Sequence, residues 1–281
     1  MVKVAIVRGT DPPEMTVEAM EMAEAEEALP GNRPVLIKPN YINDKHPSTG
    51  ITTDCRVIEG VVRFLRQHGA EEIAVGEGSG VSDTFRAFRN AGVDDIARRW
   101  NVKLLDLNKD EFVEVHPPHP LALKRVKIAR TALESTIISV PKLKLHSQTI
   151  VTLSIKNMMG AMTPKGSMHR SLSKNIADLA SVIKPSFAVV DGIIAGEGHE
   201  IGEDPVEMNL VMAGRDPVAV DAVGAAVMGV PPDEVKHLRY AEQLGLGTRD
   251  LNKIEVVGEP IEDVKREFRR SLSSRIFSLL A

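Results

Sequence analysis

The sequence predicts an α/β protein whose largely parallel sheet is flanked by helices. Apolar runs of strand length alternate along the chain with longer amphipathic runs, which is the pattern of α/β folds. A chain of 281 residues with 43% apolar and 26% charged residues can bury one large core or two modest ones. We therefore expect two related lobes around a central cleft, over residues 1–120 and 121–281, or one continuous domain.

The first half of the chain contains strand-like runs separated by amphipathic segments. Strands are predicted at 2–7, 35–38, 72–75, 103–106 and 112–115, and helices at 17–28, 56–68, 84–91 and 94–100. The second helix follows Thr52-Thr53-Asp54, whose side chains can cap free amides, and ends at Gly69. The polar segment 116–120 then breaks the pattern and marks a surface loop or a seam between lobes.

The second half continues the same alternation. Strands are predicted at 126–130, 136–140, 187–190, 210–213 and 254–257, and helices at 172–183, 217–228, 233–244 and 261–280. Asp216 and Pro217 form a typical helix start, with aspartate as the cap and proline in the first turn. Asp221 is unusual because it lies among apolar residues of the same helix, so we expect it to face the cleft or pair with a lysine.

Composition narrows the function classes. The net charge of −4 and 4% aromatic content argue against nucleic acid and anionic membranes as partners, and no apolar run has the length of a membrane span. Cys55 is the lone cysteine, so the chain cannot form an intrachain iron–sulfur cluster, and a reducing, cytoplasmic location is expected. The first residues read as a strand rather than a signal peptide. Scarce glutamine favours a thermophilic source.

The most informative segment is Pro141-Lys142-Leu143-Lys144-Leu145-His146. In an extended chain, Lys142, Lys144 and His146 project to the same face. Lys156 and Asn157 follow the apolar, strand-like run 150–155, and burying such cations is costly unless an anion meets them. The segment predicts a cleft that binds a small anion, a carboxylate or a phosphate; the alternative is a solvated edge strand whose lysines deter aggregation.

Two further candidate sites follow predicted strands. Lys38 and Asn40 close the second strand, and ligands of open α/β sheets bind beyond the carboxyl ends of strands. The glycine-rich turn with Glu77 and Gly78 follows the third strand and matches neither a dinucleotide nor a Walker motif. It is either a ligand-facing turn or a plain one.

Two loops carry the remaining candidates. Residues 158–169 are rich in methionine and read as a lid that could carry His169 to a substrate, or as an ordinary loop. The acidic, glycine-rich segment after Asp191, which contains Glu197, could hold a divalent metal through Asp191 and Glu197. It could equally supply the counter-charge for the lysines.

Several of these motifs together resemble the bacterial and archaeal domain-of-unknown-function family 362 over residues 35 to 258. They are Ile37-Lys38-Pro39-Asn40, Thr52-Thr53-Asp54, Pro141-Lys142-Leu143-Lys144, Ile155-Lys156-Asn157-Met158-Met159-Gly160, Asp191-Gly192 and Asp216-Pro217-Val218-Ala219-Val220-Asp221. The family has no general assigned activity. Many members carry a ferredoxin-like iron–sulfur domain, and this chain resembles the form without it.

The resemblance also implies a distant similarity to lactate-racemase-like nickel enzymes, whose ligands match no position here. The chain departs from the family pattern at two places. Cys55 stands where proline usually follows Thr-Thr-Asp, and His199-Glu200 replaces smaller residues.

The expected function is an enzyme that performs proton-transfer chemistry, isomerase- or lyase-like, on an anionic metabolite. The absence of a G-x-S-x-G motif disfavours acyl transfer. His146 is the expected proton carrier, because its unperturbed pKa is near neutrality. Lys156 and Glu77 are assigned with it to catalysis, and the substrate contacts are assigned to Lys38, Asn40, Thr53, Gly78, Lys142, Lys144 and Asn157.

Two alternatives stay open: a redox enzyme using a borrowed cofactor or an iron–sulfur partner, and a non-catalytic binder of a metal, cofactor or anion. The cofactor is unknown, a divalent metal is conceivable, and a homo-oligomer is also compatible with the sequence.

Overall fold

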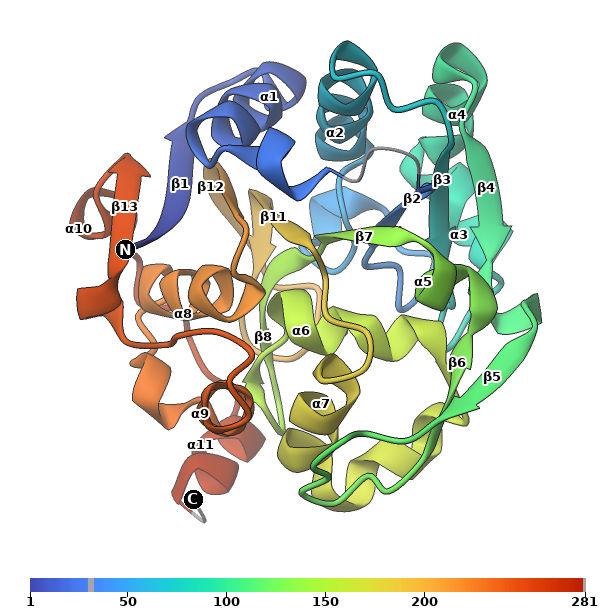
Figure 1. The fold of residues 1–281 in the computed structure, drawn as a ribbon. Coiled ribbons are helices and arrows are strands. Elements are labelled where there is room, and N and C mark those ends of the chain that lie inside the picture. The colour runs from blue at the N-terminus through green and yellow to red at the C-terminus, as the bar shows by residue number, and fades with distance from the viewer. Residues whose placement is uncertain (30–32, 280–281) are drawn as a thin grey trace.

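The computed structural model describes residues 1–29 and 33–279, the side chains of 276–279 excepted. Within these residues, ten strands form one sheet (Figure 1). Eight of them lie in the order β13-β1-β12-β11-β7-β2-β3-β4, and β8 joins β9 to β11. The bounds are β1 (Val2–Arg8), β2 (Val35–Pro39), β3 (Ile73–Glu77), β4 (Lys103–Asp106), β7 (Thr136–Val140), β8 (Lys142–His146), β9 (Ile150–Val151), β11 (Phe187–Gly196), β12 (Pro205–Gly214) and β13 (Ile254–Gly258).

The long sheet is largely parallel, as predicted. β4, β3, β2, β7 and β11 pair in parallel, as do β1 and β13, whereas β12 runs antiparallel to both β11 and β1. Strands from the two sides of residue 120 are neighbours, since β1 lies between β12 and β13 and β2 lies beside β7. The sheet is therefore continuous across that boundary. A smaller antiparallel sheet contains β5 (Phe112–Val115), β6 (Val126–Ala129) and β10 (Met162–Thr163).

Helices cover both faces of the long sheet (Figure 1). The α-helices are α1 (Pro12–Met22), α2 (Cys55–Gln67), α3 (Thr84–Ala91), α4 (Val93–Trp100), α5 (Arg130–Glu134), α6 (Leu153–Asn157), α7 (Leu172–Ala180), α8 (Pro217–Val227), α9 (Lys236–Gln243), α10 (Ile261–Val264) and α11 (Leu272–Leu279). Short 3₁₀ helices are η1 (Ala25–Ala28), η2 (Pro47–Thr49), η3 (Leu107–Lys109), η4 (Met158–Ala161), η5 (Lys165–Ser171), η6 (Pro232–Glu234) and η7 (Leu251–Lys253).

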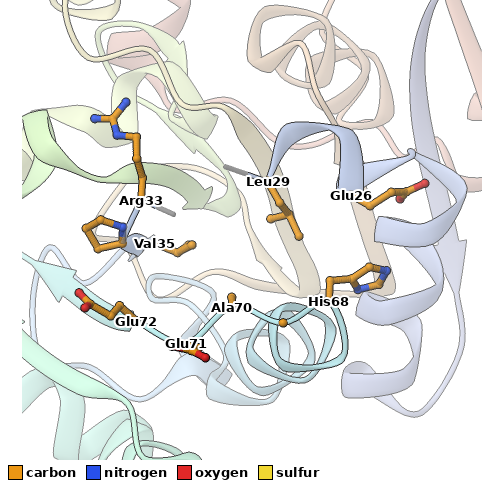
Figure 2. A pocket seen from close by; sticks show the side chains of 10 residues that line it. Glu26, Leu29, Arg33, Val35, His68, Ala70, Glu71 and Glu72 are labelled. Atoms are coloured by element: carbon orange, nitrogen blue, oxygen red, sulfur yellow. The ribbon is translucent and has the colours of Figure 1, made fainter. Parts of the chain in front are cut away.

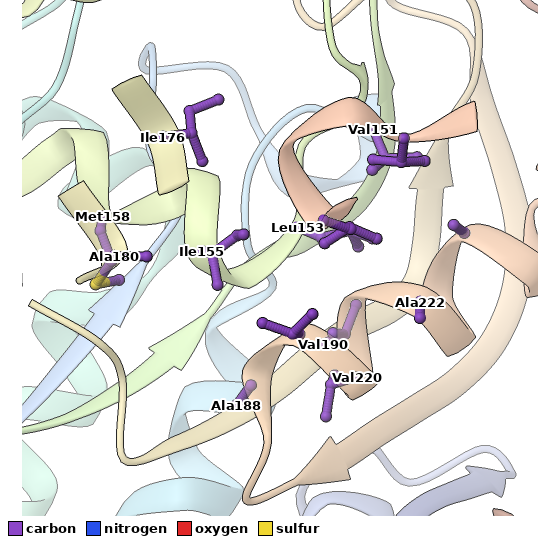
Figure 3. Close-up of a cluster of buried hydrophobic side chains, with 14 of the residues drawn as sticks. Val151, Leu153, Ile155, Met158, Ile176, Ala180, Ala188, Val190, Val220 and Ala222 are labelled. Atoms are coloured by element: carbon purple, nitrogen blue, oxygen red, sulfur yellow. The ribbon is translucent and has the colours of Figure 1, made fainter. Parts of the chain in front are cut away.

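Alternation along the strands divides the buried apolar residues between two cores. In β1, Ala5 and Val7 pack with α1 and α2, whereas Val4 and Ile6 pack with α8 on the other face. Figure 3 shows the second core, where Leu153 of α6 lies close to α8 and the strand residue Val190. This packing fixes α6 beside the sheet.

Several predicted elements were wrong in extent. β11 and β12 extend well beyond the strands predicted at 187–190 and 210–213. The first helix begins at Pro12 rather than 17, because Asp11 caps it and two prolines occupy its first turn. The run 150–155 is not one strand: only β9 is extended, Ile150 and Leu153 adopt left-handed backbone angles (φ 68° and 51°), and α6 starts at Leu153.

The tail predicted as one helix over 261–280 is divided between α10 and α11, with residue 280 outside the described part. The segment between them bonds to other parts of the fold instead of to itself. Phe268 N–H donates to the Met228 carbonyl at 3.2 Å, and the Arg269 carbonyl accepts from Gly198 N–H at 2.9 Å. These tertiary hydrogen bonds replace helical ones.

Candidate functional site

The predicted lysines converge in a buried polar cluster at the carboxyl ends of β2, β3 and β7. Lys38 Nζ lies 2.6 Å from Glu77 Oε1, and both side chains are at most 2% exposed. The ammonium also donates to Asn157 Oδ1 at 3.0 Å and to the Pro39 carbonyl at 2.8 Å. Burial lowers the pKa of Lys38, and the Glu77 carboxylate opposes this effect. Lys38 is thus fully partnered within the protein.

Asn157 connects this ion pair to the rest of the sheet. Its amide donates to the Lys38 carbonyl at 2.8 Å and to Ser139 Oγ at 3.1 Å. Asn40 reaches Asn157 Oδ1 at 3.4 Å, and no described group bonds the Asn40 Oδ1 atom. Both asparagines therefore belong to the buried polar cluster around Lys38.

Thr53 and Gly78, both expected to bind substrate, lie in the same network. The Thr53 hydroxyl accepts from Asn40 N–H and donates to the Val140 carbonyl, each at 2.8 Å. Gly78 N–H donates to Glu77 Oε1 at 2.8 Å, and a Cβ on Gly78 would lie 2.3 Å from the Gly160 carbonyl. Their contacts hold the network together.

Lys142 and Asp191 form a second buried ion pair. Lys142 Nζ lies 2.6 Å from Asp191 Oδ2, and neither side chain has exposed surface. Asp191 also accepts from the N–H groups of Asp54 at 2.6 Å and Ile193 at 2.9 Å. Burial raises the pKa of Asp191, and the Lys142 ammonium opposes the rise. Lys142 has no accessible surface through which to touch a ligand.

The predicted metal pair is not assembled. Asp191 is engaged with Lys142, whereas Glu197 accepts from Arg269 N–H at 2.8 Å and lies 3.3 Å from the Arg269 guanidinium. In residues 1–29 and 33–279, no group of three or more His, Cys, Asp or Glu side chains is arranged to hold a metal ion. The acidic loop instead supplies a counter-charge, through Glu200.

Glu200 lies against Lys144 and His146, the other two ionisable residues of β8. Lys144 Nζ donates to the carbonyls of Ile51 at 2.8 Å and Glu200 at 3.1 Å. The Glu200 carboxylate accepts from the N–H and hydroxyl of Ser147, and its Oε1 lies 3.6 Å from His146 Nε2. Burial would raise the pKa of Glu200, but the Ser147 hydrogen bonds hold it below its usual value.

His146 is a neutral imidazole in this environment. Its Nδ1 accepts from the N–H groups of Gln148 at 3.0 Å and Thr149 at 3.3 Å, so the proton of the neutral ring lies on Nε2. Burial, with the charges of Lys156 and Lys144, lowers its pKa well below 6.5. His146 therefore presents an N–H donor toward Glu200.

Lys156 differs from the other three lysines of the cluster. It is half-buried, whereas Lys38, Lys142 and Lys144 are at most 2% exposed. Among the described residues its ammonium makes no hydrogen bond or salt bridge, although Glu200 is close enough to raise its pKa. Burial prevails and lowers the pKa of Lys156 to about 8, and burial with the charge of Lys156 lowers that of Lys144 to about 7.

His237 of α9 belongs to this group and was missed in the sequence. It has no exposed surface, and neither ring nitrogen has a partner in the part of the chain that the structure describes. Burial and the charge of Lys156 lower its pKa to about 3. A histidine among the apolar positions Val235 and Leu238 was the available signal.

Asp221 holds the helix that carries Lys156. Its carboxylate oxygens accept from the N–H groups of Ser154 at 2.7 Å and Ile155 at 3.0 Å, so it caps α6 from another helix. Burial raises its pKa to about 7. Asp221 thus neither pairs with a lysine nor faces a ligand, and acts by positioning α6.

The expected lid is built into the fold over much of its length. η4, β10 and η5 span it, and Met158, Met162 and Met168 are buried. Gly160 lies directly over the Lys38–Glu77 ion pair: a Cβ there would be 2.1 Å from Glu77 Oε1. His169 is exposed, and within residues 1–29 and 33–279 it makes no hydrogen bond or ion pair with the cluster.

A separate cavity of about 610 Å³ lies at the opposite, amino ends of β2 and β3 (Figure 2). It is lined by Glu26, Leu29, Arg33, His68, Glu71 and Glu72 among others. Arg33 donates there to the Leu133 carbonyl at 3.1 Å. None of the sequence-predicted site residues lines this cavity.

Comparison with known proteins identifies a family and a relative. A family model described as "Domain of unknown function (DUF362)" matches residues 35–226. The thylakoid-associated protein sll1697 of Synechocystis sp. is 24% identical over 233 residues, which cover 77% of this chain and 69% of the relative. Among the described residues, no helix is both long enough and apolar enough to cross a bilayer.

Proposed function

Because the chain belongs to the DUF362 family, whose function is unknown, we propose its activity from the site: it binds a small anionic metabolite at Lys156 and catalyses a proton transfer, isomerase- or lyase-like. Lys156 contacts the anion, with Lys144 beside it. Lys38 and Lys142 maintain the framework through their own carboxylates.

One observation carries this proposal. Lys156 is a half-buried cation without a hydrogen-bond acceptor among the described residues, and it lies next to buried polar groups that also lack partners. Such groups lose water on burial and are stabilised when an acceptor completes them. A carboxylate or phosphate provides that acceptor. The unpartnered atoms near Lys156 include both nitrogens of His237, on which the charge of Lys156 acts.

The pKa values support lysine as the proton carrier. General acid–base catalysis is most efficient when the pKa lies near the working pH, and the pKa of Lys156 is about 8. His146, the expected carrier, is a weak base here because its pKa lies well below 6.5. We assign its Nε2–H to orienting the bound anion, with Glu200 as its neighbour.

The test compares Lys156→Met with Lys103→Met, an equal charge change at an exposed position of β4. Calorimetric titration with acetate, succinate and phosphate measures binding, and a metabolite screen measures turnover. We expect wild type and Lys103→Met to bind at least one of these three anions, and Lys156→Met to lose at least about tenfold in affinity for it. Equal affinities in all three proteins would refute the site. Binding without turnover of any metabolite would favour a non-catalytic binder.

We propose a cytoplasmic location, supported by the single cysteine, Cys55, and its fit to a reducing compartment. Membrane association is the competing outcome, suggested by the name of the thylakoid-associated relative. Fractionation of cells expressing the protein, with a salt wash of the membranes, separates these outcomes.

A further inference from the structure

The positive and negative charges of the cluster nearly cancel. We count the charged groups whose fields act on Lys144 and Lys156, together with the ion-pair partners of those groups. Among the described residues these are four ammonium groups and three carboxylates. They are Lys38, Lys142, Lys144 and Lys156 against Glu77, Asp191 and Glu200. Lys38 and Lys142 are neutralised by ion pairs of 2.6 Å with Glu77 and Asp191. Below pH 7, where Lys144 (pKa about 7) and Lys156 (pKa about 8) both carry their protons, Glu200 balances one of them and one positive charge is left over.

Glu200 sets this balance. Its charge raises the pKa of the two lysines that lack a close carboxylate of their own, Lys144 and Lys156, and its backbone carbonyl accepts from Lys144 Nζ at 3.1 Å. The loop that carries Glu200 is held in place by hydrogen bonds to Arg269, which lies outside the cluster. Glu197 and Asp204 of this loop both bind Arg269, and Gly198 N–H donates to the Arg269 carbonyl. Glu200 is therefore a fixed part of the site.

The remaining polar groups add no charge. His146 and His237 are buried and neutral, and Thr152 Oγ1 is an uncharged group without a partner. Lys165 is a further cation, but it acts on Lys38 from a half-exposed position outside the buried set, where Glu77 and Asp106 oppose its charge and solvent screens it. The site thus combines one net positive charge with several neutral hydrogen-bonding groups.

We infer that the ligand is a monoanion, namely a monocarboxylate bearing an uncharged polar group, and that Glu200 excludes dianions such as dicarboxylates and phosphate monoesters. This inference rests on the proposed function, because it specifies the ligand of that same site. The first negative charge of a ligand is matched by the excess cation. A second would lie against the Glu200 carboxylate in a poorly solvated site, where like charges repel strongly.

The experiment uses two ligands of nearly equal shape, succinate and its monoamide succinamate, which carry two charges and one. Calorimetric affinities are measured for wild type, Glu200→Gln and Glu203→Gln at pH 6.5, where Lys144 and Lys156 both carry their protons and succinate is still mostly a dianion. Glutamine at 200 keeps an oxygen for Ser147 and removes the charge. Glu203→Gln is the matched control, because Glu203 lies in the same loop but pairs with Lys45 outside the cluster. Circular dichroism confirms that each variant is folded.

We expect wild type and Glu203→Gln to bind succinamate at least about tenfold more tightly than succinate, and Glu200→Gln to lose or reverse that preference. Wild type binding succinate as tightly as succinamate would overturn the monoanion inference and leave the proposed function intact. A preference unchanged in Glu200→Gln would overturn the role of Glu200. Failure of all three proteins to bind either compound would overturn the proposed function itself.

Discussion

Removing either partner of the Lys142–Asp191 ion pair should destabilise the fold strongly, and the two removals should differ in cost. Among the described residues, Lys142 Nζ has no acceptor other than the Asp191 carboxylate, 2.6 Å away. Asp191 retains the N–H groups of Asp54 and Ile193 when Lys142 is removed. Breaking one partner of a buried pair costs about 3–5 kcal/mol. We expect Lys142→Met to lower the free energy of unfolding by about 3 kcal/mol and Asp191→Asn to lower it by about 5 kcal/mol.

Urea denaturation followed by circular dichroism measures these differences, with m-values compared to check the cooperativity of unfolding. The double variant, Lys142→Met with Asp191→Asn, removes both charges together. It should be more stable than the sum of the single losses predicts, by about 2 kcal/mol. Single losses below about 1 kcal/mol, or strictly additive ones, would refute the assignment of this pair as a structural unit.

The pH dependence of Lys142→Met follows from the same pair. Burial already raises the pKa of Asp191, and removing the ammonium that opposes this rise should raise it further. The folded variant then binds a proton more readily than the unfolded chain, so its stability falls as pH increases. The deficit relative to wild type should shrink from pH 8 to pH 5. A deficit independent of pH would show that Asp191 does not titrate in this range.

Three further predictions concern the cluster and its helix. Gly160→Ala places a Cβ 2.1 Å from Glu77 Oε1 and should lower the free energy of unfolding by about 3 kcal/mol. The control Gly166→Ala, with open space around it, should be nearly neutral. Equal urea midpoints for the two variants would contradict this prediction. Asp221→Ala leaves two α6 amides without acceptors, so it should lower the free energy of unfolding by about 2–3 kcal/mol and weaken anion binding. Thermal melting and calorimetry measure the two effects. A variant with wild-type stability and full affinity would disprove the capping role. Anion affinity should fall as pH rises through about 8, because the Lys156 ammonium loses its proton there. Calorimetry in buffers of different ionisation enthalpy should detect proton uptake on binding. Constant affinity from pH 7 to 9 would exclude that ammonium from binding.

Local pattern was sufficient for the secondary structure of most of the sheet. Alternating and continuous apolar runs predicted the strands β2, β3, β4 and β7, because the pleat period and the burial of a strand both show in its local residue pattern. Prediction failed where distant residues decide the conformation. The run 150–155 has strand-like composition, yet Asp221, 67 residues from Ser154 in sequence, accepts the amides that begin α6.

The sequence by itself determined that Lys38, Lys142, Lys144 and Lys156 lie in or directly after apolar runs, and it favoured their burial over a solvated edge strand, because burial depends largely on the neighbouring residues. It could not determine which of them is left for a ligand. That depends on the tertiary structure, which brings Glu77 to Lys38 and Asp191 to Lys142 over 39 and 49 positions and leaves Lys156 without a close carboxylate. The physical reason is that an ion pair requires contact within a few ångströms. The number of residues between two side chains does not predict such contact, because the folded sheet decides which distant residues meet.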